Sequence, residues 1–408
     1  MKGKLPAGFH LFVKISLVFS LLLFSPALAA AGDIELVSVG PDGVLGNGHA
    51  QERPSISADG RFVAFSSSAT NLVEGMTISG GLYVHDRETD TTELVSVSTG
   101  GTKSTGSRPS ISADGRYVAF WSASTTLVTG DTNSVFDIFV RDRELKTTVR
   151  VSVSSDELQS NGMSWAPQIS ADGTRVAFYS TATNLVSGDT NGYYDIFVRD
   201  LSAGTTTRVS MAHDGTQLNG DSENPSISAD GRYVAYTTYA TNAVGTVVDN
   251  NPLGDIIVRD TLNNTNTFVS ATYAGGVGDG GSMDASISTD GRYVAFVSSS
   301  SDLVPGDTNY YNDIFVRDLQ LNTTTRVSVK SNGDQATGGN SEYPHISGNG
   351  RFVTFSSLAT NLVDLDTNSG KDVFIHDRLT GETIRASVNS EGRSEEHTSE
   401  LQSRQSLS

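Results

Sequence analysis

A short acidic loop that recurs along the chain carries the residues best suited to bind a ligand. It reads Gly-Asp-Thr-Asn-x-x-x-Asp at residues 130–137, 188–195 and 306–313, and residues 366–372 keep the same Asp, Asn and Asp spacing. Carboxylate and amide oxygens at such short intervals are the ligands that hard cations prefer, so each loop is a candidate calcium site. The candidate ligands are Asp131, Asn133 and Asp137; Asp189, Asn191 and Asp195; Asp307, Asn309 and Asp313; and Asp366, Asn368 and Asp372.

The same loops have a second interpretation. The fifth position of a calcium loop usually supplies oxygen or is Gly, and here only Gly370 fits, because Val135, Tyr193 and Tyr311 stand at that position in the other loops. Asp and Asn side chains also fix loops by bonding to nearby backbone groups. We therefore expect either weak calcium sites or turns held by their own hydrogen bonds, and no other cofactor.

Catalytic arrangements are not evident in the sequence. The chain has no Cys, which excludes disulfides, thiolate nucleophiles and Cys-ligated metals. There is no Gly-x-Ser-x-Gly nucleophile motif. His85 and His376 replace Arg at one point of a repeat, and His49, His213 and His345 are spread over three units without metal-ligand spacing. The sequence therefore favours a protein that is not an enzyme.

A repeat organises the rest of the chain. Ile-Ser-Ala-Asp-Gly or a close variant marks each of six units, and successive marks are 55 to 60 residues apart. The marks lie at residues 56–60, 111–115, 169–173, 227–231, 287–291 and 346–350. A fixed period of this length is typical of propellers and solenoids.

Each unit reads as four short strands. In the second unit they are Pro-Ser-Ile-Ser (109–112), Arg-Tyr-Val-Ala-Phe (116–120), Asp-Ile-Phe-Val-Arg-Asp (137–142) and Arg-Val-Ser-Val (150–153). An Asp-Gly turn joins the first two strands, and β-branched and aromatic residues dominate all four. The pattern predicts an all-β fold over residues 32–392: a six-bladed β-propeller with four antiparallel strands per blade.

Closure of the ring has two interpretations. Residues 34–39 already read as a fourth strand ahead of the first unit, and residues 383–388 read as another after the sixth. The sequence thus contains seven segments that read as a fourth strand but only six sets of the first three strands. We favour six blades with one spare strand, and the alternative is a seven-bladed ring in the natural protein.

The repeats resemble the WD40-like repeat of the TolB propeller family, in which Ser-Pro-Asp-Gly-(Lys/Arg)-x-(Ile/Val)-Ala-Phe marks each blade. The Pro of that motif is replaced here by Ala58, Ala113, Ala171, Ala229, Thr289 and Gly348. The resemblance covers residues 33–392 but not the α/β domain that precedes the propeller in TolB. It therefore implies the propeller fold and not a role in the Tol–Pal envelope system.

Both ends of the chain differ from the repeats. Residues 1–29 have basic residues, an apolar run and a small-x-small cleavage pattern, which predict a signal peptide. Residues 393–408 break the repeat, and residues 393–403 resemble a translated sequencing adapter, so we exclude them as artefactual or disordered. Export without stable membrane insertion after cleavage is predicted, to the bacterial periplasm or the medium.

Charge and loop composition narrow the range of partners. The net charge is −18, which disfavours nucleic acid because phosphate binding requires Lys and Arg clusters. Aromatic residues lie beside acids in the long loops, as at Tyr193, Tyr194, Tyr310 and Tyr311. We expect an exported, non-catalytic scaffold that binds a partner, foremost a protein, on its loop-rich rim. The alternatives are a carbohydrate- or cell-wall-binding module and a propeller enzyme such as a polysaccharide lyase or hydrolase.

Overall fold

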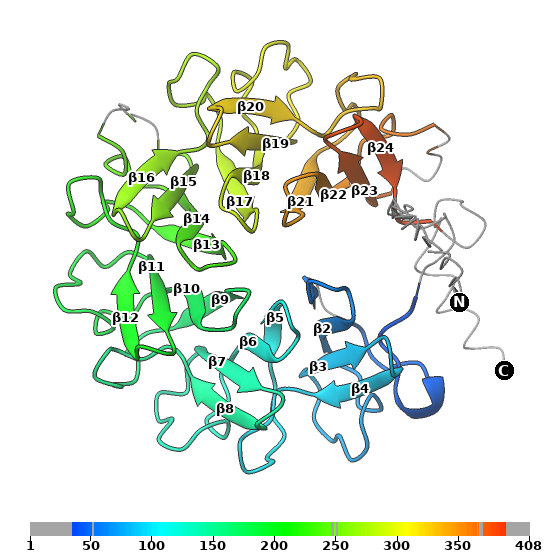
Figure 1. Ribbon diagram of the computed structural model, residues 1–408, viewed down its shortest axis with the longest axis vertical. Helices are drawn as coiled ribbons and strands as arrows, with labels where there is room; N and C mark the ends of the chain where they lie inside the picture. Colours follow the sequence, from blue (N-terminus) through cyan, green and yellow to red (C-terminus); the bar gives the residue numbers. More distant parts are fainter. Residues whose placement is uncertain are drawn as a thin grey trace, which may run out of the picture.

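A computed structural model describes residues 35–50, 53–245, 249, 252–364, 366 and 370–388. The expected signal peptide (1–29) and the tail (393–408) lie outside these residues. Within them the chain forms six four-stranded antiparallel sheets, each made of consecutive strands. Figure 1 shows these blades around a centre, with the first strands inside and the fourth strands on the perimeter. The prediction of a six-bladed all-β propeller is confirmed.

The blades are numbered along the chain. Blade 1 comprises β1 (Ser55–Ile56), β2 (Phe62–Ser67), β3 (Gly81–Asp86) and β4 (Thr91–Leu94). Blade 2 comprises β5 (Ser107–Ile111), β6 (Tyr117–Ser122), β7 (Asp137–Asp142) and β8 (Thr147–Arg150). Blade 3 comprises β9 (Ser164–Ile169), β10 (Arg175–Ser180), β11 (Asp195–Asp200) and β12 (Thr205–Arg208). Blade 4 comprises β13 (Ser222–Ile227), β14 (Tyr233–Thr238), β15 (Asp255–Asp260) and β16 (Thr265–Phe268). Blade 5 comprises β17 (Ser282–Ile287), β18 (Tyr293–Ser298), β19 (Asp313–Asp318) and β20 (Thr323–Arg326). Blade 6 comprises β21 (Ser341–Ile346), β22 (Phe352–Ser357), β23 (Asp372–Asp377) and β24 (Glu382–Arg385), and a short 3₁₀ turn, η1 (Pro41–Gly43), precedes blade 1.

The fourth strand lies earlier in each unit than its sequence pattern suggested. In blade 2 it ends at Arg150, so Val-Ser-Val follows the strand instead of forming it. The ladder ends because Ser152 replaces a backbone acceptor: its hydroxyl accepts the N–H of Ile138 at 3.1 Å. Val153 then forms a bridge with Gln159 of the next loop.

The prolines of the first strand also lie differently from the prediction. In blades 2, 3, 4 and 6 they stand inside the strand and not at its first residue, at a point where the register with the second strand shifts. In blade 4, Asn224 and Pro225 together oppose Tyr236, which is a β-bulge. Proline is tolerated there because the first strand is the inner edge of the sheet and needs no ladder donor.

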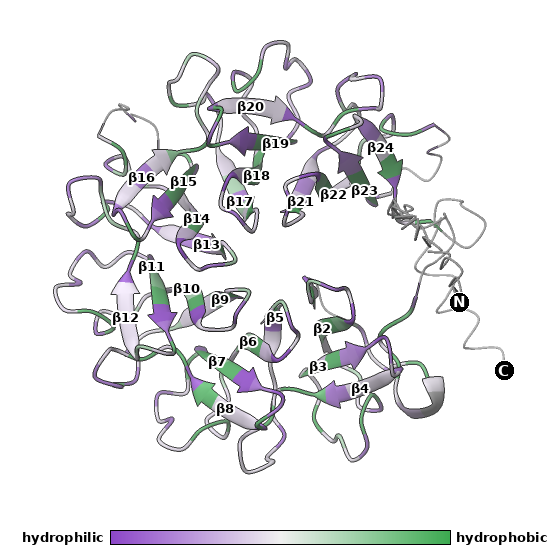
Figure 2. Ribbon diagram, viewed as in Figure 1, coloured by the Kyte–Doolittle hydropathy of each residue, from purple (hydrophilic) through white to green (hydrophobic). Residues whose placement is uncertain are grey.

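Apolar cores lie between neighbouring blades. In each one, an Ala from the second strand of one blade packs with an aromatic residue from the second strand of the next, as Ala119 does with Phe178. Figure 2 shows the third strands β7 and β11 changing from hydrophobic to hydrophilic toward their ends, where the sequence reads Arg-Asp. Among the described residues, no helix has the length and hydropathy to cross a membrane.

The Asp-Gly turns fit against the preceding blade. Gly115 has φ 74°, and a Cβ added there would lie 2.1 Å from a ring carbon of Phe62 in blade 1. Arg61 and Arg143 lie over the same ring at 4.8 and 4.4 Å, which restricts its movement. Gly60 of blade 1 has φ 75°, but its nearest atom is the Arg87 guanidinium at 3.7 Å.

These two glycines allow a matched test of blade packing. We predict that Gly60→Ala costs about 1 kcal/mol through its left-handed backbone alone. Gly115→Ala should cost roughly 1–3 kcal/mol more, because the new methyl overpacks against Phe62. Urea unfolding of both variants measures the difference, and equal losses would contradict the packing described here.

Candidate functional site

The acidic loops meet an arginine in four blades. Asp189 and Asp195 of blade 3 lie 3.0 and 3.1 Å from the guanidinium of Arg208, the last residue of β12. The counterparts in blades 2, 5 and 6 are Arg150 with Asp131 and Asp137, Arg326 with Asp307 and Asp313, and Arg385 with Asp366 and Asp372, at 2.9–3.9 Å. A guanidinium therefore holds the two carboxylates of each loop together.

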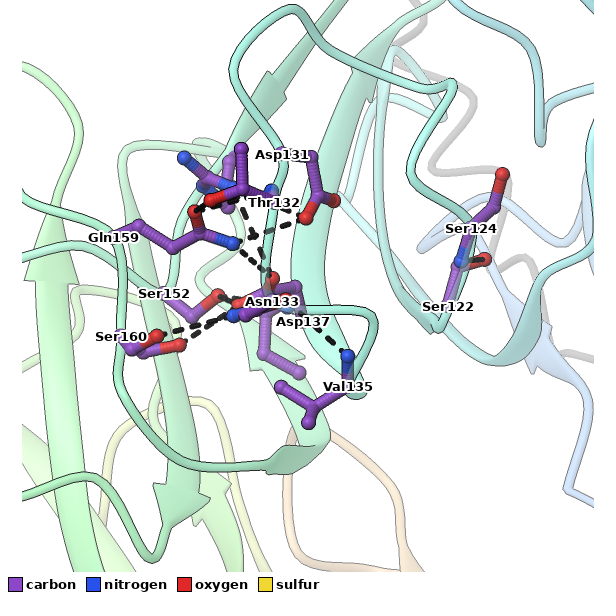
Figure 3. Close-up of polar contacts among 12 residues, drawn as sticks. Ser122, Ser124, Asp131, Thr132, Asn133, Val135, Asp137, Ser152, Gln159 and Ser160 are labelled. Atoms are coloured by element: carbon purple, nitrogen blue, oxygen red, sulfur yellow. Dashed lines mark hydrogen bonds and ion pairs between the residues drawn. The ribbon is translucent and has the colours of Figure 1, made fainter.

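The second carboxylate of each loop is deeply buried. Asp195 is fully shielded from solvent and accepts a hydrogen bond of 2.5 Å from Ser210. Figure 3 shows the blade 2 site, where Asp137 accepts from Ser152 and Ser160. In blade 3 burial raises the pKa of Asp195 and of Asp189, and Arg208 opposes this by stabilising the ionised form.

The asparagines of the loops make turns. Asn133 accepts the N–H of Val135 at 3.2 Å and donates to the carbonyl of Ser160 at 3.0 Å (Figure 3). Asn191 and Asn309 likewise accept from Tyr193 and Tyr311, at 3.2 and 2.9 Å. Asn368 lies outside the described residues. The three described asparagines thus behave as the turn hypothesis expects.

Calcium binding stays a prediction. In the part of the chain that the structure describes, no group of three or more His, Asp or Glu side chains is arranged to hold a metal ion. Each described loop brings two acids together, and in four blades an arginine supplies the positive charge between them.

Blade 4 keeps the acids but has lost the arginine. Phe268 occupies the position of Arg208, while Asp249 and Asp255 remain. The Asp255 side chain is 97% shielded, accepts from Ser270 at 2.7 Å, and its Oδ2 has no hydrogen-bond partner in the described part of the chain. Burial, with a smaller contribution from the charge of Asp249, raises the pKa of Asp255 to about 7.

A cavity lies in the central channel, which sequence reasoning did not single out. Its volume is about 480 Å³, and residues from all six first strands line it. At the bulge of blades 2 to 6, and at the matching position of blade 1, one non-glycine residue has a left-handed backbone, with φ between 46° and 62°. These residues, here called the bulge ring, are Arg53, Arg108, Ala166, Asn224, Asp284 and Tyr343.

The side chains of the bulge ring differ from blade to blade, although their neighbours repeat. Arg53 lies 3.2 Å from Asp284 and over the ring of Tyr343 at 5.2 Å, so it links blades 1, 5 and 6 across the channel. Arg108 is half-buried over Trp121 at 5.6 Å and forms no salt bridge within the described residues. The channel wall therefore presents cations, an acid and aromatic surface at the same depth along the channel.

His345 adds a titratable group to the channel wall. Its side chain is exposed to the channel, yet the surrounding blades displace bulk water and lower its pKa. The imidazole is therefore neutral near pH 7 and can accept or donate a hydrogen bond. It lies one residue after Pro344 of the bulge in β21.

The loops predicted to form a rim open on the same end as the bulge ring. Gln159, in the loop from the fourth strand of blade 2 to the first of blade 3, donates to Asp131 in the loop between the second and third strands. Trp165 is the second residue of the channel-side strand β9 and stacks on Tyr179 at 5.3 Å, with the ring of Tyr194 at 5.8 Å. Tyr310 is 94% exposed, so part of the predicted aromatic rim does face solvent.

Comparison with known proteins supports the fold. No family model matches the sequence, and no curated protein is significantly similar to it. Among solved structures, an oligogalacturonate lyase in complex with manganese aligns with TM-score 0.51 and 11% identity, over 82% of this chain and 75% of that one. TolB from Acinetobacter baumannii aligns with TM-score 0.42 and 17% identity over 75% of this chain, which spans 59% of that TolB chain.

A third similar structure is the propeller domain of the Trilobed protease from Pyrococcus furiosus, described as having an open velcro topology. It aligns with TM-score 0.41 and 12% identity, over 84% of this chain and 96% of that domain. The expected resemblance to a TolB-type propeller is confirmed for the fold, which is what similarities at this identity show. The lyase shows that this fold also occurs in an enzyme.

The loop acids give a direct test of calcium binding. If calcium binds them, millimolar calcium should raise the melting temperature, because a ligand of the folded state stabilises it by mass action. The combined variant Asp131→Ala, Asp189→Ala and Asp307→Ala should then show a smaller shift. Identical melting curves with calcium and with chelator would leave the loops as turns held by arginine and hydrogen bonds.

Asp255 should make stability depend on pH. Its pKa of about 7 in the folded protein lies above the value of about 3.9 in an unfolded chain, so the folded state holds the proton more tightly. The stabilisation of the folded state by protonated Asp255 is complete below pH 4 and is lost as the pH rises to about 7. The total loss is up to roughly 4 kcal/mol of the free energy of unfolding. We predict that Asp255→Asn raises the free energy of unfolding at pH 8 and has little effect at pH 4.

Asp195→Asn is the matched control for Asp255→Asn. It replaces the same strand position in blade 3, where Arg208 is present, and should destabilise by about 3 kcal/mol because it leaves a buried guanidinium short of one partner. Urea unfolding from pH 4 to 8 measures both variants. If both lose stability equally at pH 8, Asp255 is ionised and adequately paired in the folded protein.

Proposed function

We propose that this chain is an exported, non-catalytic propeller that binds a protein partner at the mouth of its central channel. The observation that carries the proposal is the bulge ring. Six repeats keep the same left-handed backbone at one channel position and place Arg, Arg, Ala, Asn, Asp and Tyr there. A purely structural role would favour one residue type, and foremost Gly or Asn, in that conformation.

The cost of this backbone supports a binding role. A non-glycine residue with positive φ costs about 1–2 kcal/mol, and such strain is concentrated at functional sites. The bulge turns one side chain per blade toward the channel, so the ring can present a mixed surface while the blades stay alike. Arg108 over Trp121 offers a cation on an aromatic surface, and residues of both kinds are enriched at binding hot spots.

The predicted rim takes part in this proposal. The long loops surround the mouth, and exposed Tyr193, Tyr194, Tyr310 and Tyr311 would extend the contact outward. We place the protein in the periplasm or the medium, in keeping with the expected signal peptide. A partner that enters the mouth would contact the bulge ring first and the rim second.

A carbohydrate ligand is the second candidate. Trp165, Tyr179 and Tyr194 form a stacked aromatic group near the channel entrance, and aromatic faces of this kind bind sugars. Binding to a glycan array that is lost in a Trp165→Ala variant would favour this function over a protein partner.

The proposal predicts that binding depends on the channel mouth. Arg108→Ala combined with Tyr343→Ala should reduce capture of the partner from envelope extract at least tenfold, because both side chains line the mouth. Alanine is compatible with this backbone, since blade 3 carries Ala166 at φ 46°. Quantitative pull-down with wild-type and variant bait measures the loss.

The matched control changes the outer rim. Tyr193→Ala combined with Tyr310→Ala removes exposed aromatics without changing the channel. Equal capture by the channel variant and the wild type would contradict the proposed site. Catalytic turnover abolished by a single channel substitution, such as His345→Ala, would contradict the non-catalytic part of the proposal.

A further inference from the structure

Every boundary between neighbouring blades joins the same two surfaces. The trailing face of a blade, as defined here for blade 2, carries Ala119, Ile138, Val140 and Val151. The leading face of the next blade supplies an Ile, a Val, a Leu and aromatic residues to the same core. Five cores of this kind join blades 1 to 6 in order.

The trailing face of blade 6 is uncovered. Val373 is 41% exposed, whereas its counterparts in the other five blades are completely buried. These counterparts are Leu82, Ile138, Ile196, Ile256 and Ile314. Thr354, Ile375 and Ala386 of the same face are half-buried. The residues that form a core in every other blade here face solvent.

The leading face of blade 1 is exposed at its inner strand, whereas Phe65 and Leu72 on the same face are buried in a small core that includes Val37. Ile56 is 56% exposed, whereas Ile111, Ile169, Ile287 and Ile346 are at most 8% exposed. The turn glycine agrees with this: a Cβ at Gly60 would meet no aromatic ring, in contrast to Gly115 against Phe62. Figure 1 shows blades 1 and 6 apart on the right, and their strands do not pack together as neighbouring blades do.

A series of backbone hydrogen bonds ends at the same place. The turn residue of each blade donates its N–H to the carbonyl of the equivalent residue in the next blade, at 2.9–3.0 Å. The series runs from Ala58 through Ala113, Ala171, Ala229 and Thr289 to Gly348. It leaves the carbonyl of Ala58 and the N–H of Gly348 without the partners that this series gives to every other blade. The two ends are complementary, one an acceptor and the other a donor.

Residues 35–39 hold the position of the end of an outer strand, and of the segment that follows it, from a preceding blade. The Val39 carbonyl accepts from the Thr92 hydroxyl at 2.7 Å, as the Val153 carbonyl of blade 2 accepts from Thr206 of blade 3 at 2.6 Å. Gly46 donates its N–H to the carbonyl of Ser38, as Ser160 donates its N–H to the carbonyl of Ser152. Val39 forms an isolated antiparallel β-bridge with Leu45, as Val97 does with Lys103. Leu36 in this segment is 55% exposed.

We propose that the sector between blades 6 and 1 is the seat of a seventh blade, formed by three antiparallel strands of this same repeat and completed at its outer edge by residues 35–39. Such a blade would cover Val373 with its leading face and Ile56 with its trailing face. Its turn residue would accept from Gly348 and donate to Ala58. Its bulge would add a seventh side chain to the channel wall.

The test extends the chain with the missing strands. A copy of residues 330–381, which contain one interblade loop and the three strands β21–β23, is joined after Val388. The chain has no Cys, so Val373→Cys and Ile56→Cys variants report exposure through their rates of thiol labelling. The extension should slow both rates at least tenfold and raise the melting temperature. Ile314→Cys, at a buried counterpart, should label slowly with or without the extension.

Two further arms keep the outcome decisive. The same segment supplied as a separate polypeptide should protect the Val373→Cys variant of the original chain, even if the extended chain fails to fold. A scrambled segment of equal length should give no protection. Unchanged labelling and melting in both formats would overturn the proposal. It would also be overturned if the original chain already protects Val373→Cys and elutes as a dimer, because a second copy would then occupy the sector.

Discussion

Each blade of this propeller has two apolar faces, and at every boundary between blades these faces leave water by packing against each other. The contact that repeats at every boundary is a small side chain against an aromatic one, as with Ala119 and Phe178, or Ala235 and Phe296. Because stability of this kind is the sum of nearest-neighbour interfaces, no blade is independent of its position in the ring. The exposure of Val373 and Ile56 follows directly, since the two outermost faces have no neighbour among the described residues.

The same packing permits the strained channel wall. Six left-handed residues cost several kcal/mol together, and the interblade cores beside the first strands offset that cost. The scaffold is thereby separated from the recognition surface. The Ile that follows each bulge is the same in all six blades, whereas the bulge residue itself varies and can define what the channel accepts.

Much of the fold was readable in the sequence because its signals are local. The Asp-Gly turns, the Pro-Ser-Ile motif and the period of 55 to 60 residues indicate strands and turns without reference to distant residues. The limits of the fourth strand could not be read from the sequence. A serine hydroxyl ends the ladder at Ser152, and Ser is common throughout these strands. The position of the prolines was misjudged for a similar reason, since a bulge depends on the pairing of two strands.

The candidate sites depend on contacts between distant residues and were less accessible. The loop acids were recognised, but their arginine stands in another part of the unit, 13 residues from the second acid in the pair Asp195–Arg208. A signal for it existed: Arg is present in the four units with intact loops, while Leu94 and Phe268 replace it in the two altered ones. The bulge ring gives no signal of this kind, because variable residues beside a repeated motif look like ordinary variation until the fold brings them around one channel.

The connectivity of the blades has a consequence for the gene. The four strands of every blade are consecutive, and all five boundaries are built alike. Unequal recombination between such repeats would insert or delete whole blades while leaving every remaining boundary intact. A circular permutation at the same point of another repeat would likewise preserve each blade and move the chain termini to a different pair of neighbours. The number of blades is therefore an inherited copy number, which the packing at any one boundary does not fix.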